Sequence, residues 1–185
     1  GGGAEVFATE IREELCPEKL SGEEWLNTMR IAHNLGLKSN ATMLYGHIEQ
    51  DKDRINHLLK LRELQDETGG FMTFIPLAFH PKNTDMKNIS STAGILDLKM
   101  LAIGRLMLDN FDHIKAFWIM LGIKISQISL SFGVDDIDGT VAEEKITHSA
   151  GAETPEALTV NEIRSLIEET GREPVERDTL YNRIN

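Results

Sequence analysis

The chain has 185 residues, 41% of them hydrophobic and 26% charged, which is an ordinary composition for a globular domain. Its formal net charge of −11 argues against nucleic acid or an anionic membrane surface as a partner, because both require a cationic patch. The longest apolar stretch, 95–108, is interrupted by charged residues, so no transmembrane segment is expected. The single cysteine, Cys16, excludes an internal disulfide and fits a reducing, cytoplasmic setting.

The first residues predict an incomplete N-terminus followed by helices. Three glycines open the chain without an initiating methionine or a signal peptide, so the natural N-terminus is expected to be absent. Apolar residues at near-helical spacing predict a short helix over 5–15 that Pro17 ends. Ser21 and Glu24 form the pattern of a capping box, which predicts a second helix that ends near Gly36.

From residue 39 onward, strands and helices alternate. The pattern predicts strands near 40–46, 72–79, 114–120 and 134–137. Asp51 is expected to cap the first intervening helix, and Gly69 to end it. Further helices are expected at 92–110, at 123–132, from about Thr140, and from a second capping box at Thr159 to Gly171, with an extended tail after it.

This order predicts an α/β fold with a parallel sheet, because the strands are apolar on both faces and helices lie between them. An open flavodoxin-like sheet is an alternative, although no glycine-rich phosphate loop follows a strand. Half of an eight-stranded barrel explains four such strands better, and residues 1–185 then form a single domain. In such barrels the active site lies at the C-terminal ends of the strands, where each strand leads into the following helix.

Two histidines close predicted strands and are therefore candidate functional residues. His47 follows the first strand and His80 the second, where imidazoles could bind carboxylates, transfer protons or ligate a metal. The alternative for each is a hydrogen-bonded structural histidine. Three further histidines, His33, His57 and His113, are expected on helices or helix ends at the surface.

The acidic segment 135–138 does not fit a calcium loop. With Gly139 at the sixth position, the first and twelfth positions would be Val134 and Lys145, and neither is acidic. Asp138 is left as a turn or cap residue, as a hydrogen-bond acceptor for a ribose, or as a residue that orders a neighbouring side chain. Glycines 1–3 would let a ligand approach the backbone closely, since glycine has no side chain to exclude it.

Several strings along nearly the whole chain resemble the aminofutalosine synthase family of menaquinone biosynthesis, within the radical S-adenosylmethionine superfamily. They are GGGAE at 1–5, NATMLYGH at 40–47, LRELQDETGGF at 61–71, FIPLAFHP at 74–81, RLMLDN at 105–110, WIMLG at 118–122 and DGTVAEEKITH at 138–148. The futalosine-pathway cyclase is similar but differs at 43–47, 118–122 and 143–148. A deazaflavin-chromophore synthase is a more distant relative.

The resemblance implies the C-terminal half of a radical S-adenosylmethionine barrel, with S-adenosyl-L-methionine and a [4Fe-4S] cluster as cofactors. The cluster is held in the family by a Cys-x-x-x-Cys-x-x-Cys motif on the first barrel strand, and this chain lacks the motif. The implied partners are the missing N-terminal half of the same polypeptide, a reductant protein for the cluster and a small-molecule substrate. The chain alone is expected to be inert, and its upstream coding sequence should contain the cysteine motif.

The implied reaction adds the 5'-deoxyadenosyl radical to 3-[(1-carboxyvinyl)oxy]benzoate, and rearrangement with loss of the carboxyl carbon gives aminodeoxyfutalosine. The implied catalytic residues are His47 and His80, and no residue is assigned to a metal. The candidates for cofactor binding are Gly2, Gly3, Glu5 and Thr42, and those for substrate binding are Tyr45, Trp118, Asp138 and Arg177. Two other classes stay open, which are a substrate-binding half-barrel and a non-radical enzyme that uses the two histidines as acid and base.

Overall fold

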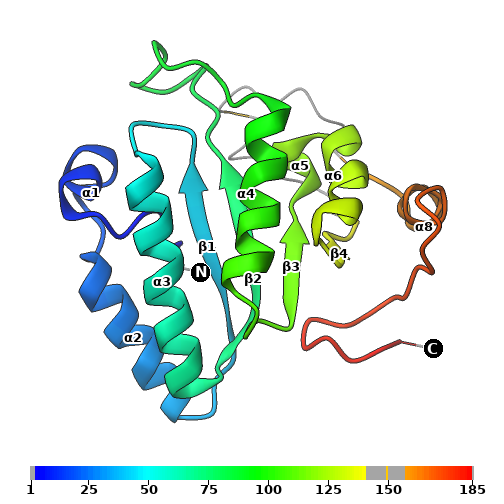
Figure 1. The fold of residues 1–185 in the computed structure, drawn as a ribbon, viewed down its shortest axis with the longest axis horizontal. Coiled ribbons are helices and arrows are strands. Elements are labelled where there is room, and N and C mark those ends of the chain that lie inside the picture. Colours follow the sequence, from blue (N-terminus) through cyan, green and yellow to red (C-terminus); the bar gives the residue numbers. More distant parts are fainter. Residues whose placement is uncertain (1–2, 141–148, 150–156, 185) are drawn as a thin grey trace.

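The computed structural model describes residues 3–140, 149 and 157–184. Its strands run in parallel and its helices connect them (Figure 1). The strands are β1 (Ser39–Tyr45), β2 (Phe71–Ala78), β3 (His113–Ala116) and β4 (Asp136–Ile137). The helices are α1 (Thr9–Leu15), α2 (Gly22–Asn34), α3 (Asp51–Thr68), α4 (Gly94–Met107), α5 (Trp118–Leu121), α6 (Ile123–Ser129), the 3-10 helix η1 (Leu130–Phe132) and α8 (Val160–Glu168).

The sheet has the order β1-β2-β3-β4, and every neighbouring pair is parallel. The four predicted parallel strands are therefore confirmed. The third strand is shorter than predicted, because the chain turns into α5 at Trp118 and leaves the sheet after Ala116. The apolar run 114–121 is thus part strand and part helix. Periodicity in so short an apolar run does not distinguish a strand from a helix. The helix predicted from Thr140 lies almost entirely outside the described residues.

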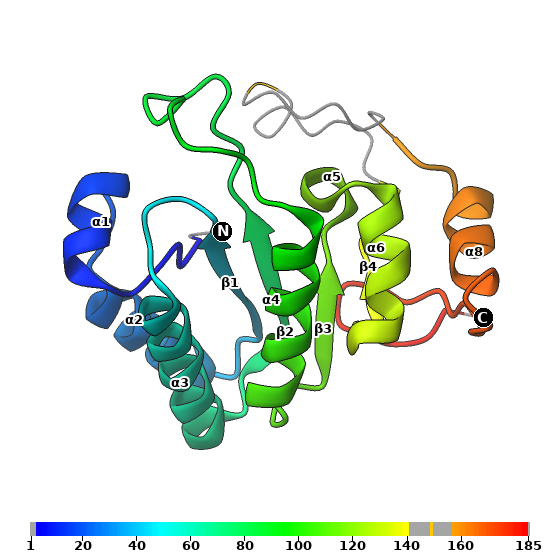
Figure 2. The same cartoon turned by 45° about the horizontal axis from the view of Figure 1, so that its top comes forward.

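The helices α3, α4 and α6 all lie on one face of the sheet (Figures 1 and 2). Met43, Phe74 and Ile114 point into this layer and are fully buried. Phe74 packs so closely on α4 that a side chain at Gly104 would lie 3.1 Å from its ring. Alternation places Asn40 and Thr42 on the opposite face, where they are more exposed. Among the described residues, helices thus cover one side of the sheet only, as expected for a half-barrel, and the tail lies against the other side at His113.

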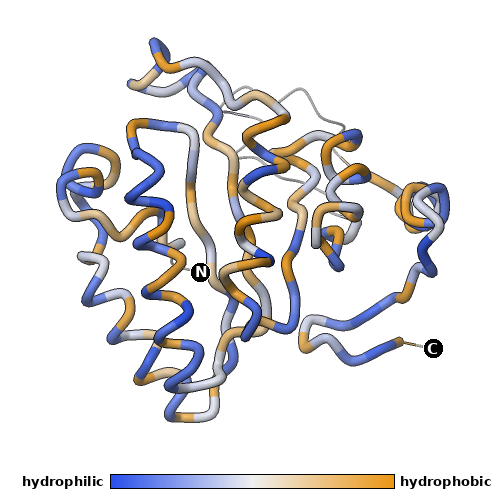
Figure 3. The backbone as a smooth tube through the Cα atoms, viewed as in Figure 1, coloured by the Kyte–Doolittle hydropathy of each residue, from blue (hydrophilic) through white to orange (hydrophobic). Residues whose placement is uncertain are grey.

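The local signals for helix ends are largely confirmed. Both predicted capping boxes form, with Ser21 and Thr159 each accepting a hydrogen bond from the third helical amide. Gly69 ends α3 in the left-handed conformation at φ 57°. The N-cap of α3 is Gln50, one residue before the predicted Asp51. Along the chain, α4 is largely hydrophobic, and the tail after α8 is largely hydrophilic (Figure 3).

Of the three histidines predicted at the surface, two are buried and the third lies on a different element than predicted. His57 is fully buried, stacks on Phe7 with ring centroids 4.0 Å apart, and donates a 3.0 Å hydrogen bond from Nε2 to the Thr42 carbonyl. His33 is also buried. His113 lies on β3 rather than on a helix. Helical spacing could not reveal these positions, since polar residues are buried wherever a distant segment supplies a hydrogen-bond partner.

None of the helices that the structure describes is long and apolar enough to cross a membrane. The predicted absence of a transmembrane segment agrees with this finding for those residues.

Candidate functional site

His47, His80 and Asp138 each follow the C-terminal end of a strand. They come after β1, β2 and β4, respectively, and these strands run in the same direction. The three residues therefore share one rim of the sheet. This rim is where barrel enzymes of this architecture assemble their active sites.

The His47 side chain is buried within a hydrogen-bond network in the loop after β1. Its Nε2 donates to the Leu44 carbonyl at 3.0 Å, and Nδ1 lies 3.1 Å from Glu49 without hydrogen-bond geometry. Glu49 is buried and accepts from the backbone amides of Gly46 and His47 and from Arg54, at 2.6, 2.8 and 2.8 Å. Burial lowers the pKa of His47, and the charge of Glu49 opposes that shift. The imidazole thus holds the loop together in this conformation.

His80 connects the loop after β2 to α5. Its Nε2 donates to the carbonyl oxygen of Met120 at 2.9 Å, and the residue is half-buried. That bond fixes the ring orientation and leaves Nδ1 without a hydrogen bond to the described residues. Of the two candidate catalytic histidines, only His80 keeps a ring nitrogen outside the buried interior.

The segment around Glu5 lies beside β1 at its rim end. The Ala4 amide donates to the Thr42 hydroxyl at 3.0 Å, and the Leu44 amide donates to the Glu5 carbonyl at 2.8 Å. Glu5 adopts φ 52° and pairs with Lys19 at 2.5 Å. A Cβ at residue 3 would lie 2.8 Å from the Glu5 carboxylate, so a larger residue there would displace the end of the Glu5 side chain. Of the predicted cofactor-binding residues, Gly3, Glu5 and Thr42 come together, whereas Gly2 lies outside the described residues.

Two predicted substrate-binding residues are buried and hydrogen-bonded within the chain. The Tyr45 hydroxyl donates to buried Asp97 of α4 at 2.7 Å, on the helix-covered side of the sheet. Burial raises the pKa of this phenol, and the Asp97 charge adds to the shift. Trp118 is 1% exposed, and its indole N–H donates to the Gly139 carbonyl at 3.2 Å. This geometry favours structural contacts for both side chains.

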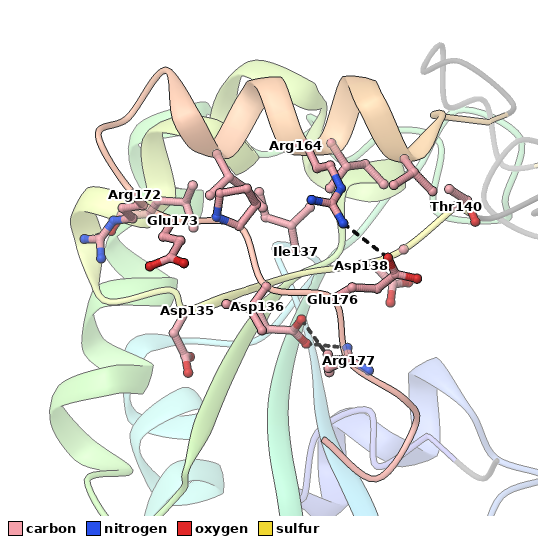
Figure 4. A pocket seen from close by; sticks show the side chains of 17 residues that line it. Asp135, Asp136, Ile137, Asp138, Thr140, Arg164, Arg172, Glu173, Glu176 and Arg177 are labelled. Atoms are coloured by element: carbon pink, nitrogen blue, oxygen red, sulfur yellow. Dashed lines mark hydrogen bonds and ion pairs between the residues drawn. The ribbon is translucent and has the colours of Figure 1, made fainter. Parts of the chain in front are cut away.

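The open face near β3 and β4 carries a network of charges, and sequence reasoning found only part of it. Arg177 donates to Asp136 through Nη2 and Nε at 2.7 and 3.2 Å (Figure 4). The Tyr181 hydroxyl donates to the same carboxylate at 2.7 Å. Lys115 donates to Asp138 at 3.1 Å and lies 3.7 Å from Asp136. The one available signal was a lysine within the otherwise apolar segment 114–121.

A pocket of about 620 Å³ lies between β4, α8 and the tail (Figure 4). Ile137, Ile163 and Ile167 form its apolar part, and Arg164 pairs with Glu176 at 3.4 Å on its wall. Within the described residues, no group of three or more histidine, cysteine, aspartate or glutamate side chains could hold a metal ion.

Four parallel strands with helices on one face give the fold class that was predicted, half of a (β/α)8 barrel. Methylornithine synthase has the same fold, with a TM-score of 0.70 and 17% identity over 94% of this chain and 51% of that one. A family model described as the CofH/MqnC C-terminal region matches residues 68–185. The chain belongs to this family, which agrees with the resemblance noted in its sequence.

Relatives extend the match to the whole chain. It is 50% identical to the aminodeoxyfutalosine synthase of Thermus thermophilus, over 100% of this chain and 50% of the relative. It is 45% identical to the aminodeoxyfutalosine synthase of Streptomyces coelicolor, over 98% of this chain and 50% of the relative. The chain is also 41% identical to a 5-amino-6-(D-ribitylamino)uracil–L-tyrosine 4-hydroxyphenyl transferase of Methanococcoides burtonii. This match covers 100% of this chain and 54% of the relative. The chain spans about half the length of these relatives.

Proposed function

We propose that this chain is the C-terminal half of a radical S-adenosylmethionine enzyme that forms aminodeoxyfutalosine. The observation that carries this proposal is 50% identity to an aminodeoxyfutalosine synthase along the full chain. The half-barrel supports it, since one face of the sheet is uncovered and the candidate residues share a rim. The partner implied by this geometry is a second half-barrel that carries the cluster-binding cysteines.

The residues near Glu5 fit a nucleoside-bearing cofactor better than they fit a metal. Gly3 and Glu5 lie beside β1 and are partly exposed, and a larger residue at position 3 would displace the Glu5 carboxylate. Thr42 and Glu5 offer hydroxyl and carboxylate oxygens next to it. With Cys16 as its single cysteine, the chain cannot supply the thiolates of a [4Fe-4S] cluster, so those ligands belong to the other half.

S-adenosyl-L-methionine, cleaved reductively at the cluster, would supply the 5'-deoxyadenosyl group that bonds to the enol-ether carbon of 3-[(1-carboxyvinyl)oxy]benzoate. This chain positions the two reactants and excludes water from them. His80 presents Nδ1 at the rim, where it can meet a polar group of the substrate. The cytoplasm is the proposed location, and a reductant protein is the proposed electron source.

A second candidate function follows from the transferase relatives, which are 41–43% identical to this chain. The names of these transferases specify 5-amino-6-(D-ribitylamino)uracil and L-tyrosine as reactants. The synthase relatives are more similar, at 45–50%. The futalosine-pathway cyclase is a further alternative, because the matched family model also covers that group.

One assay separates these alternatives. The polypeptide that contains this chain and its upstream region is reconstituted anaerobically with iron and sulfide. It is then given S-adenosyl-L-methionine, a reductant and each substrate set in turn. We expect aminodeoxyfutalosine from the carboxyvinyl ether and no product from tyrosine with the uracil. Product formation only from tyrosine with the uracil would contradict the proposal. An upstream region that lacks the three-cysteine motif would contradict it as well.

A further inference from the structure

Lys115 is a charged residue on the open face of the sheet. It lies in β3 between Ile114 and Ala116, which are both fully buried on the helix-covered side. Because successive strand residues alternate between faces, the Lys115 side chain points to the uncovered face. The residue is nevertheless 8% exposed. A cation held so far from water is costly unless it has a partner of opposite charge.

Among the described residues, the Lys115 ammonium uses only part of its hydrogen-bond donors. It has three N–H groups, and its one contact within hydrogen-bond distance of this part of the chain is to Asp138 at 3.1 Å. Asp136 lies farther away, at 3.7 Å. At least one donor is therefore available to a ligand on the open face.

Asp136 does not compete for this ammonium, because the tail occupies it. Arg177 binds both its oxygens, and the Tyr181 hydroxyl donates a third hydrogen bond. The Arg177 guanidinium lies 4.1 Å from the Tyr181 ring centroid, and that ring stacks on His113 at 3.9 Å. The tail thus neutralises Asp136 and fixes it from one side.

The tail is itself held in a defined turn. Asp178 accepts hydrogen bonds from the amides of Leu180 and Asn182, both at 2.8 Å. Tyr181 adopts φ 64°, a conformation that residues other than glycine rarely take. Such a conformation persists where the surroundings determine it strongly, as the contacts of Tyr181 do here.

We infer that Lys115 binds a carboxylate of the substrate, with Arg177 and Tyr181 as positioning residues that keep Asp136 from sharing its charge. This inference rests on the proposed function, in which the substrate carries two carboxylates that need cationic partners once buried. Two of the other candidates for that role are engaged elsewhere, whereas His80 remains for the second carboxylate. Arg177 is bound to Asp136, and the His47 ring is enclosed by its own loop.

The test compares Lys115→Met, Lys115→Arg and Lys124→Met in the full-length protein. Lys124 lies exposed on α6 and serves as the matched control. The probes are 3-[(1-carboxyvinyl)oxy]benzoate and its two monomethyl esters, and their dissociation constants are measured by calorimetry. Losing a hydrogen bond to a charged group weakens binding by about tenfold to a hundredfold. We expect that loss for the diacid in Lys115→Met, with Lys115→Arg intermediate and Lys124→Met unchanged.

The esters identify the contact. One monoester should bind wild type and Lys115→Met equally, because its blocked carboxylate is the one that Lys115 would meet. Equal diacid binding by wild type and Lys115→Met would overturn the inference, even if the enzyme makes aminodeoxyfutalosine. A wild type that neither binds the diacid nor forms the product would overturn the proposed function and this inference with it.

Tyr181→Phe provides a second variant in case Lys115→Met does not fold. It keeps the ring stacked on His113 and removes only the hydroxyl that donates to Asp136. A positioning role predicts a severalfold higher KM for the carboxyvinyl ether with unchanged kcat and an unchanged melting temperature. An unchanged KM in Tyr181→Phe, with Lys115→Arg also binding the diacid as wild type does, would overturn the inference.

Discussion

The Tyr45 hydroxyl donates a 2.7 Å hydrogen bond to Asp97 and so joins the end of β1 to α4 across the core. Both residues are buried, and they are 52 positions apart in the chain. A carboxylate in such a position requires a donor, because an unpaired buried charge is costly. The contact therefore couples the rim of the first strand to the helix layer that covers the sheet.

Tyr45→Phe is expected to destabilise the protein by about 1–3 kcal/mol, because it leaves the Asp97 carboxylate without this donor. The free energy of unfolding is measured by urea denaturation monitored by circular dichroism. Tyr45→Phe combined with Asp97→Leu removes both polar groups and should recover part of the loss. A double variant less stable than the sum of the two single losses would show that the pair does not act as described.

Stability should fall as the pH drops from 7 toward 5, in part because of His57. Burial lowers the pKa of this imidazole to about 3, whereas an unfolded chain protonates it near pH 6.5. Below pH 6.5 the His57 imidazole thus binds a proton in the unfolded state but not in the folded state. This difference removes up to about 1.4 kcal/mol of stability per pH unit until the folded pKa is reached.

Comparison with His57→Gln isolates the contribution of this residue, since the other titrating groups cancel in the difference between the two curves. The variant should be less stable at pH 7, where it loses the ring stack on Phe7 and the bond to Thr42. Its stability should depend less steeply on pH between 6.5 and 5. Parallel curves for the two proteins would mean that His57 is accessible to protons in the folded state.

The isolated chain is expected to self-associate. The edges of β1 and β4 are not paired with another strand among the described residues, apart from the single bond from Leu44 to Glu5, and one face of the sheet is uncovered. Unpaired edges and uncovered apolar surface favour association between chains. Sedimentation velocity at several concentrations measures it. A monodisperse monomer that melts cooperatively would indicate that the chain completes its own core.

His80→Ala in the full-length protein should lower aminodeoxyfutalosine formation while leaving the cluster intact. If Nδ1 meets a buried carboxylate, the lost contact costs about 1–3 kcal/mol of substrate binding. Iron content and uncoupled S-adenosylmethionine cleavage should persist, because the thiolate ligands lie outside this chain. Unchanged product formation would leave His80 with only its structural bond to Met120.

The sequence by itself determined the order and direction of the elements. Capping boxes at Ser21 and Thr159 and the left-handed Gly69 act over a few residues, so their meaning is readable locally. Parallel strands followed from apolar runs separated by helices. The shared rim of His47, His80 and Asp138 followed in turn, because parallel strands end on the same side.

Only the tertiary structure decided which side chains can face a ligand and which bind other residues of the protein. Tyr45 lies at a strand end, yet its hydroxyl binds Asp97 in the helix layer. Arg177 is bound to Asp136, 41 residues before it, and this contact leaves Lys115 available on the open face. Such partners come from segments far apart in the chain. Their identity depends on register and on the path of the tail, which hydrophobic periodicity does not encode.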